Sequence, residues 1–116
     1  MKWFKEEEFK CRCGRCNGGY DDMDIHLIIM LDEIREMCAF PIHLNSAYRC
    51  LKHNDNIGGR TNSTHTKGTA VDIKCEDDWH RSKLIQALVK LGVTSFGIYP
   101  TFIHFDLRDQ NACWLG

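Results

Sequence analysis

Two histidines and one aspartate have the side chains and the spacing that a metal site would need. His65 and Asp72 lie seven positions apart with Gly68 between them, and His104 follows in a later segment. Three ligands of this kind with one position left open suit a catalytic zinc ion, whereas a structural zinc site is more often closed by four ligands. Zinc lowers the pKa of bound water to about 7 and polarises a carbonyl group, so this pattern indicates hydrolysis of an amide or ester.

Alternating apolar and polar residues predict that strands carry two of these ligands. Residues 69–73 and 103–107 both alternate in this way. Because successive side chains of a strand point to opposite faces, Asp72 would share a face with Ala70, and His104 with Asp106. Any one of these polar residues alone would more often be a surface or hydrogen-bonded residue. Together they predict a metal site on the polar face of two half-buried strands.

Four further groups of residues have a recognisable pattern: Ser63-x-His65-x-x-Gly68-x-Ala70-x-Asp72, Ser46-Ala47-Tyr48-Arg49 with the trailing Asn54 and Gly58-Gly59, Gly97-Ile98-Tyr99-Pro100, and Phe102 to Arg108. Their types and order resemble the zinc D-Ala-D-Ala carboxypeptidase family of peptidoglycan metallopeptidases. The resemblance is to its short branch, found in phage endolysins and murein endopeptidases, and it extends from about Phe9 to Trp114. It implies that His65, Asp72 and His104 bind zinc.

Arg49 is the candidate for holding an anionic group of a substrate. Its planar guanidinium suits the carboxylate at the D-amino-acid end of a peptide or the oxyanion that develops on attack. The resemblance supports such a role, although Ala47 stands where the family has glycine; a structural salt bridge is the alternative. Tyr48, in the same motif, is expected to bind substrate. Ser63 could hydrogen-bond substrate or only shape its turn.

The general base is not evident from the sequence. Many members of the family carry a glutamate or another proton acceptor a few residues before the last zinc histidine. Thr101 and Phe102 occupy those places here, and neither can accept a proton from water. Asp106 shares the predicted strand face of His104, so it could deprotonate the water or orient His104 or Arg49. We favour the orienting role.

The seven cysteines include one close group, Cys11, Cys13 and Cys16. This group could be a second metal site if Cys50 or a histidine supplied a fourth ligand. The alternative is a loop whose thiols stay free or pair on oxidation, and the lack of a second Cys-x-x-Cys pair favours it. The scattered cysteines, each most simply a small buried apolar residue, are Cys38, Cys50, Cys75 and Cys113.

We expect a single domain spanning residues 1–116, with the cysteine-rich segment 9–20 packed on it. A helix is predicted to open at Asp22-Met23-Asp24 and to stop at Pro41, and another to begin within residues 75–78 and to end before Gly92. Strands are predicted at residues 42–46, 69–73, 95–99 and 102–108, with a long loop at 52–66. This order predicts an α+β fold of the hedgehog/D-Ala-D-Ala peptidase type: a small antiparallel sheet with helices on one face and the zinc cleft on the other.

Composition limits the partners. A net charge of −1 gives no general attraction to nucleic acid, and no apolar run is long enough to insert in a membrane. No signal peptide is predicted from the first residues, which lack an apolar stretch. We therefore expect a monomer that is made in the cytoplasm and acts on stem peptides of the cell wall after release by lysis or by a holin-type partner.

Two functions remain open on the sequence. The first is a zinc peptidase that hydrolyses D-amino-acid-containing bonds of bacterial peptidoglycan, as a D,D-carboxypeptidase or an endopeptidase, for example in a phage endolysin. The second is a non-catalytic module that keeps the zinc and binds a peptide or a partner, as hedgehog signalling domains of similar fold do. Arg49 and the open coordination position favour the first function, and the missing upstream base favours the second.

Overall fold

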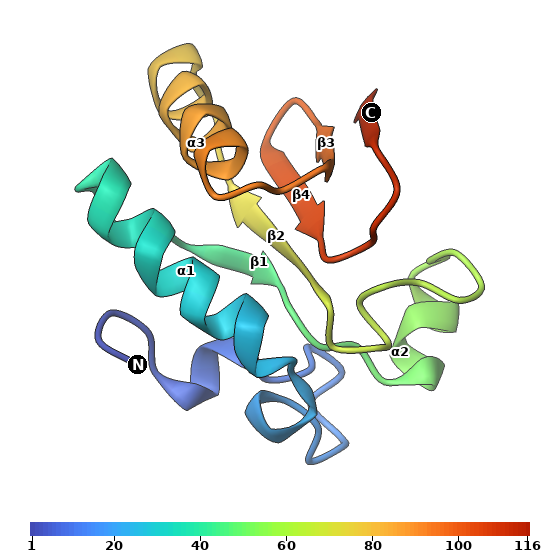
Figure 1. Ribbon diagram of the computed structural model, residues 1–116. Coiled ribbons are helices and arrows are strands. Elements are labelled where there is room, and N and C mark those ends of the chain that lie inside the picture. The colour runs from blue at the N-terminus through green and yellow to red at the C-terminus, as the bar shows by residue number, and fades with distance from the viewer.

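The protein is built on one sheet with helices against it. A computed structural model describes residues 1–116 (Figure 1). In chain order the elements are the 3-10 helices η1 (Glu6–Phe9) and η2 (Tyr20–Asp22), α1 (Ile25–Cys38), β1 (Leu44–Ser46), α2 (Leu51–Asn56), β2 (Ala70–Lys74), α3 (Asp78–Lys90), β3 (Ser95–Ile98), β4 (Phe102–Asp106) and β5 (Ala112–Leu115).

The five strands lie in the order β1-β2-β4-β3-β5. All neighbouring pairs are antiparallel except β3 and β5, which are parallel. The predicted α+β class with a small sheet is thus confirmed. Strand β5 was not predicted, because its short stretch at the end of the chain has no clear apolar alternation; it extends the sheet beside β3.

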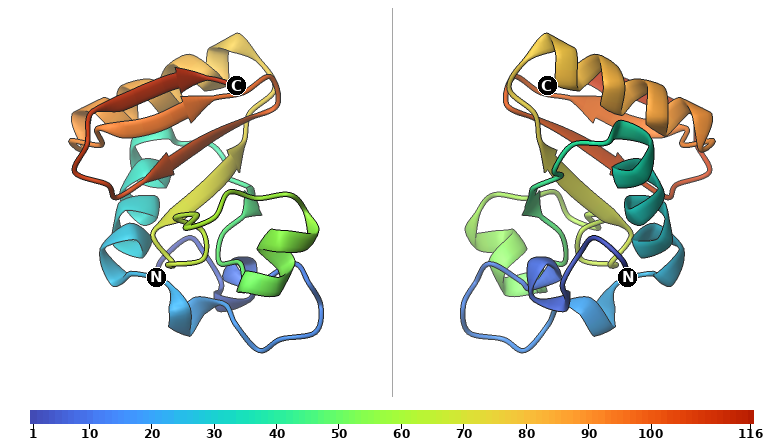
Figure 2. Two further views of the ribbon diagram at one scale, coloured as in Figure 1. Left: turned by 90° about the vertical axis from the view of Figure 1, so that its right-hand side faces the viewer. Right: turned by 90° about the vertical axis from the view of Figure 1, so that its left-hand side faces the viewer.

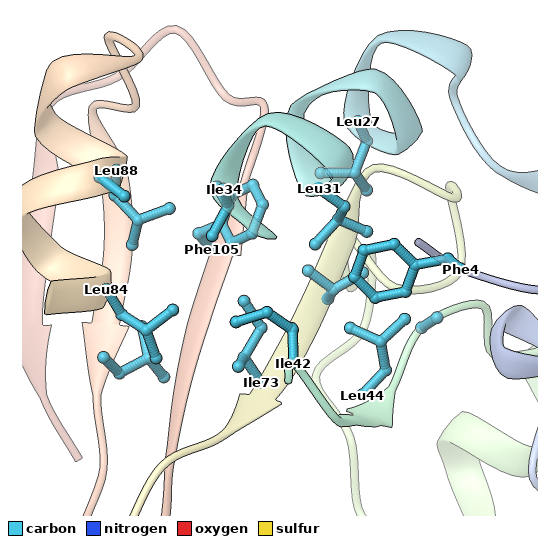
Figure 3. Packing of buried hydrophobic residues seen from close by; sticks show 14 of the residues in the cluster. Phe4, Leu27, Leu31, Ile34, Ile42, Leu44, Ile73, Leu84, Leu88 and Phe105 are labelled. Atoms are coloured by element: carbon cyan, nitrogen blue, oxygen red, sulfur yellow. The ribbon is translucent and has the colours of Figure 1, made fainter. Parts of the chain in front are cut away.

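Helices α1 and α3 cover one face of the sheet, as Figure 2 shows from both sides. The inward side chains of β2 and β4 form cross-strand pairs there, Val71 with Phe105 and Ile73 with Ile103, all at most 1% exposed. Leu31 and Ile34 of α1 and Leu84 and Leu88 of α3 pack against them (Figure 3). Because the strand side chains alternate, the opposite face is left for the polar residues of β2 and β4.

The two long helices begin where their capping residues predict. The Asp24 carboxylate accepts a hydrogen bond from the backbone N–H of His26 at the start of α1, and Asp77 does the same for His80 at the start of α3. Helix α1 ends at Cys38, and its C-cap Ala39 adopts a left-handed conformation (φ 58°) shortly before Pro41. None of the helices has the length and apolar character needed to span a bilayer.

Part of the segment expected to be a loop is helical. Residues 51–56 form α2, with Cys50 as its N-cap: the sulfur accepts a hydrogen bond from the backbone N–H of His53 at 3.4 Å. The helix is short and mostly polar, so it lacks the apolar periodicity by which a helix is recognised in sequence. The remainder of the predicted loop, residues 57–66, has no helix or strand, and residues 67–69 connect it to β2.

Gly68 fixes the loop that carries His65, and we expect its replacement to destabilise the protein. Its φ is +71°, and a Cβ atom there would lie 1.9 Å from the backbone oxygen of Asp22. Gly68→Ala should therefore lower the free energy of unfolding by about 3 kcal/mol or more, measured by urea denaturation at a fixed zinc concentration.

Gly92→Ala is the matched control for Gly68→Ala. Gly92 has a similar left-handed backbone (φ +81°), but no atom lies within 4 Å of the added Cβ. The free energy of unfolding of Gly92→Ala should fall only by the cost of the left-handed backbone conformation, about 1 kcal/mol. Equal losses in the two variants would show that the contact with Asp22 contributes nothing.

Candidate active site

The register of β2 and β4 brings two of the predicted ligands together. Asp72 and His104 are direct cross-strand partners on the face opposite α1 and α3. The loop before β2 adds His65. One ligand atom from each of the three residues lies within 4.8 Å of the others. The sequence places these residues 39 positions apart at most, and the sheet gathers them into one group.

The ring of His65 is oriented by the backbone. Its Nδ1 lies 2.8 Å from the carbonyl oxygen of Ala47, which can only accept, so Nδ1 carries the proton. In the neutral ring the lone pair is then on Nε2, which lies 3.1 Å from Oδ1 of Asp72. A lone pair thus faces a carboxylate oxygen across a hydrogen-bonding distance.

The ring of His104 repeats this arrangement from the other side. Its Nε2 lies 2.8 Å from Oδ2 of Asp106, and its Nδ1 lies 2.9 Å from the same Oδ1 of Asp72. If Nε2–H donates to Asp106, Nδ1 presents its lone pair to Asp72. Three electron-pair donors therefore meet at one point, an arrangement that needs protons on both rings or a divalent cation between them.

The electrostatics agree with a site that attracts positive charge. Burial by itself would raise the pKa of Asp72, but hydrogen bonds from His104 and His65 outweigh it and lower that pKa to about 2. Burial would lower the pKa of His104, whereas its hydrogen bonds to Asp106 and Asp72 raise it. The carboxylate is thus held ionised, and the donor set fits a zinc ion: two imidazole nitrogens and one carboxylate oxygen, each ring oriented by a further acceptor.

An open cleft of about 390 Å³ lies over these ligands. The loop at residues 58–65 and the end of the sheet around Tyr99, Phe102 and Trp114 line it, together with Arg49 and Arg108. The cleft is polar, and a peptide could reach the ligands from solvent. Its only carboxylate is Asp72, and its only imidazoles are those of His65 and His104.

The family model for Peptidase M15 matches residues 2–106. The chain belongs to the peptidase M15 family. No curated protein matches it. M15 peptidases are zinc-dependent metallopeptidases, and in this member the three residues that the sequence analysis selected as ligands form the cluster described above.

Arg49 of this M15 family member lines the cleft beside Asp72. Its Nη2 lies 3.5 Å from Oδ2 of Asp72, Nε donates to Ser46 Oγ at 3.2 Å, and Nη1 donates to Asn54 Oδ1 at 3.2 Å. Three of the five N–H groups of the guanidinium are engaged, which leaves two without a protein partner. The side chain is both fixed by the protein and able to bind an anion.

Asn54 positions Arg49 and was not selected from the sequence as a site residue. It is 3% exposed, accepts from Arg49 and donates to the carbonyl oxygen of Arg60 at 2.9 Å. Gly59 lies directly over it, since a Cβ on Gly59 would come within 2.0 Å of Asn54 Oδ1. The Asn and the Gly pair of the motif therefore have a physical link that sequence spacing does not reveal.

Asp106 lies behind His104, away from the cleft. Its side chain is fully buried, and its oxygens accept from His104 Nε2, from the Arg108 guanidinium at 2.8 and 3.0 Å and from the Arg108 backbone. Burial would raise the pKa of Asp106, but the hydrogen bonds from His104 and Arg108 lower it. This position favours orientation of His104 over proton transfer from water in the cleft.

The two residues expected to bind substrate have different surroundings. Ser63 lines the cleft, and its Oγ also accepts from the backbone N–H of His65 at 3.2 Å, so it shapes the turn that leads to that ligand. Tyr48 is not part of the cleft lining. Its ring packs against Gly18 of the N-terminal segment, where a Cβ would come within 2.3 Å of it. The substrate-binding role of Tyr48 therefore stays a prediction, and the contact seen for its ring is with the N-terminal segment.

Trp114 forms a wall of the cleft that the sequence analysis did not predict. Its indole lies over Gly97, where a Cβ would meet Nε1 at 2.3 Å, and its ring centroid is 5.5 Å from that of His104. Its Nε1–H donates to Tyr99 Oη at 2.9 Å. The only signal in the sequence was Gly97 within a strand, which marks a close approach by another group.

The predicted cysteine group also forms in three dimensions. Cys11, Cys13 and Cys16 lie together, and Cys50 joins them. All seven cysteines are free thiols. Cys113, expected to be buried, is exposed because it lies on the outward face of the edge strand β5.

Proposed function

We propose that the protein is a zinc peptidase that hydrolyses D-amino-acid-containing peptide bonds of bacterial peptidoglycan. The observation that carries this proposal is the convergence of His65 Nε2, His104 Nδ1 and Asp72 Oδ1 at the floor of an open cleft. The family membership supports the peptidase activity, and the motif resemblance supports the cell-wall substrate. Lysis or remodelling of the wall, including lysis by a phage endolysin, is the setting that this resemblance suggests.

The residues in and around the cleft would have different roles in such a reaction. Zinc bound by His65, Asp72 and His104 would supply a water of lowered pKa and polarise the scissile carbonyl. Arg49 would bind the substrate carboxylate or the oxyanion, since two of its N–H groups have no protein partner and its Nη2 lies 3.5 Å from Asp72 Oδ2. Asp106 would hold the ring of His104 with its lone pair toward the site. Trp114 would limit access of bulk water from the β5 side.

Digestion of purified peptidoglycan tests the proposal directly. Zinc-loaded protein should release new amino groups, chelator should abolish the release, and added zinc should restore it. The masses of the products decide the bond: free D-alanine would identify a carboxypeptidase, and the splitting of cross-linked dimers an endopeptidase. No new amine from a range of peptidoglycan types would contradict the proposed substrate.

A second function has one observation in its favour. Apart from the three ligands, no carboxylate or imidazole lines the cleft, so no side chain is placed to accept a proton from an attacking water. A zinc-containing module that binds peptide without cleaving it is consistent with this. Calorimetric binding of a stem peptide to zinc-loaded protein, with the peptide recovered intact, would favour this function over hydrolysis.

Asp106→Asn separates an orienting role from a catalytic base. An asparagine oxygen can still accept from His104 Nε2, but the amide loses the charge and part of the contact with Arg108. We expect zinc affinity or hydrolysis to fall by about 10–100-fold, with recovery of activity at high zinc. Asp109→Asn, an exposed neighbour, is the control. Complete inactivity of Asp106→Asn at saturating zinc would instead favour the base.

A further inference from the structure

Four cysteine sulfurs lie together outside the cleft, and three of these cysteines line a separate surface hollow. They come from the N-terminal segment, which contributes three, and from the N-cap of α2, which contributes one. All four Sγ atoms lie within 4.8 Å of one another, and Cys13 and Cys16 are 3.4 Å apart. In a tetrahedral zinc site with Zn–S bonds of about 2.3 Å, sulfurs are separated by about 3.8 Å. The spacing is close to that of a complete ligand set.

The backbone already compensates negative charge on three of these sulfurs. Cys13 Sγ accepts from the N–H groups of Arg15 and Cys16, both at 3.3 Å, and Gly14 (φ +70°) makes the turn that aims them. Cys11 Sγ accepts from the Cys50 N–H at 3.3 Å, and Cys50 Sγ accepts from His53. Hydrogen bonds of this kind favour the thiolate, which is the form that binds metal.

Nearby basic side chains would partly neutralise the negative charge of four thiolates. Four thiolates around a divalent ion leave two net negative charges, and Arg15 and Lys52 line the same surface hollow as three of the cysteines. Cys11 is 2% exposed, whereas the other three are partly exposed, so an ion could enter from solvent. Four thiolates and no open position are typical of a structural rather than a catalytic zinc site.

We propose that the chain binds a second, structural zinc ion in this four-cysteine cluster: Cys11, Cys13, Cys16 and Cys50. The ion displaces the thiol protons to solvent and joins residues 11–16 to residue 50. That junction lies beside Arg49 and three positions from Ala47, whose carbonyl oxygen orients His65. The second ion therefore stabilises the segment that carries Arg49 and the Ala47 carbonyl group that orients His65.

Metal counting by native mass spectrometry tests the proposal, and the Asp72→Ala variant separates the two sites. Wild-type protein loaded with zinc should hold two ions per chain. Asp72→Ala removes a ligand of the first site only and should hold one. Cys13→Ser/Cys16→Ser should lose the other ion, and the combined variant should hold none. Cys113→Ser, which changes an exposed thiol outside the four-cysteine cluster, should keep the wild-type count.

Cobalt substitution gives a second measurement that does not depend on whether the serine variant folds. Cobalt in Asp72→Ala should show the strong near-ultraviolet thiolate-to-metal charge-transfer band and the visible bands of a tetrahedral ion. Loss of this ion should also lower the thermal midpoint of the full chain. Absence of metal from Asp72→Ala, a cobalt spectrum without the thiolate band, or disulfides among these cysteines in the metal-free protein isolated under reducing conditions would overturn the proposal. An unchanged count in Asp72→Ala would contradict the first site instead.

Discussion

Asp72→Ala should lose the ion of the candidate active site and, with it, hydrolysis of peptidoglycan. Asp72 Oδ1 is the one atom that both rings approach, at 3.1 Å from His65 Nε2 and 2.9 Å from His104 Nδ1. Its removal leaves two imidazoles, which cannot hold zinc with the affinity of three ligands. We expect hydrolysis to fall by on the order of 10³-fold or more, equivalent to about 4 kcal/mol of activation free energy.

A shape-matched variant and a distant one complete this experiment. Asp72→Asn keeps the volume of the side chain in β2 but removes its charge, so it should fold and also lose most activity. Asp78→Ala removes a solvent-exposed carboxylate in the first turn of α3 and should keep wild-type zinc content and rate. Wild-type activity in Asp72→Ala would show that the three-residue cluster is not the site of chemistry.

The sequence could predict which side chains of the two strands share a face, because strand alternation is a local rule. Residues two apart in a strand share a face, so the faces of residues 70–74 and 103–107 can be assigned from the sequence. The structure places Asp72 opposite His104 in agreement with this assignment. Helix α1 and its cap at Asp24 follow from local signals as well. These features depend on neighbours in the chain, so one sequence is enough to predict them.

The features that the sequence could not provide depend on contacts between distant segments. Asp106 is buried behind His104, where Arg108 also contacts it. The alternation of the strand predicts only that Asp106 and His104 share a face, and a general base and an orienting residue would both meet that condition. The wall formed by Trp114 needs the parallel pairing of β5 with β3 over Gly97. Such pairings are set by packing between segments, and no periodicity within either segment encodes them.

Arg49 is expected to have the second-largest effect on hydrolysis. Arg49→Ala should lower kcat by about 10²–10³-fold if the guanidinium stabilises the developing oxyanion, a loss of about 3–4 kcal/mol. Arg49→Lys keeps the charge but not the planar fork, which Ser46 and Asn54 hold in place, so it should recover only part of the rate. Arg60→Ala changes an exposed arginine of the same cleft and should cause a much smaller loss.

Paired substrates separate the three roles of Arg49. If it binds the terminal carboxylate, a stem peptide with a free carboxylate should have a lower KM than its amide in the wild type, and Arg49→Ala should remove that difference. If it stabilises the oxyanion, kcat should fall equally for both peptides while KM changes little. A purely structural ion pair with Asp72 predicts neither result: removing the guanidinium would lower zinc content or the free energy of unfolding and leave the kinetics of the zinc-loaded fraction unchanged. Because Arg49 is held by three protein contacts and still has two donors free, we expect one of the two kinetic results.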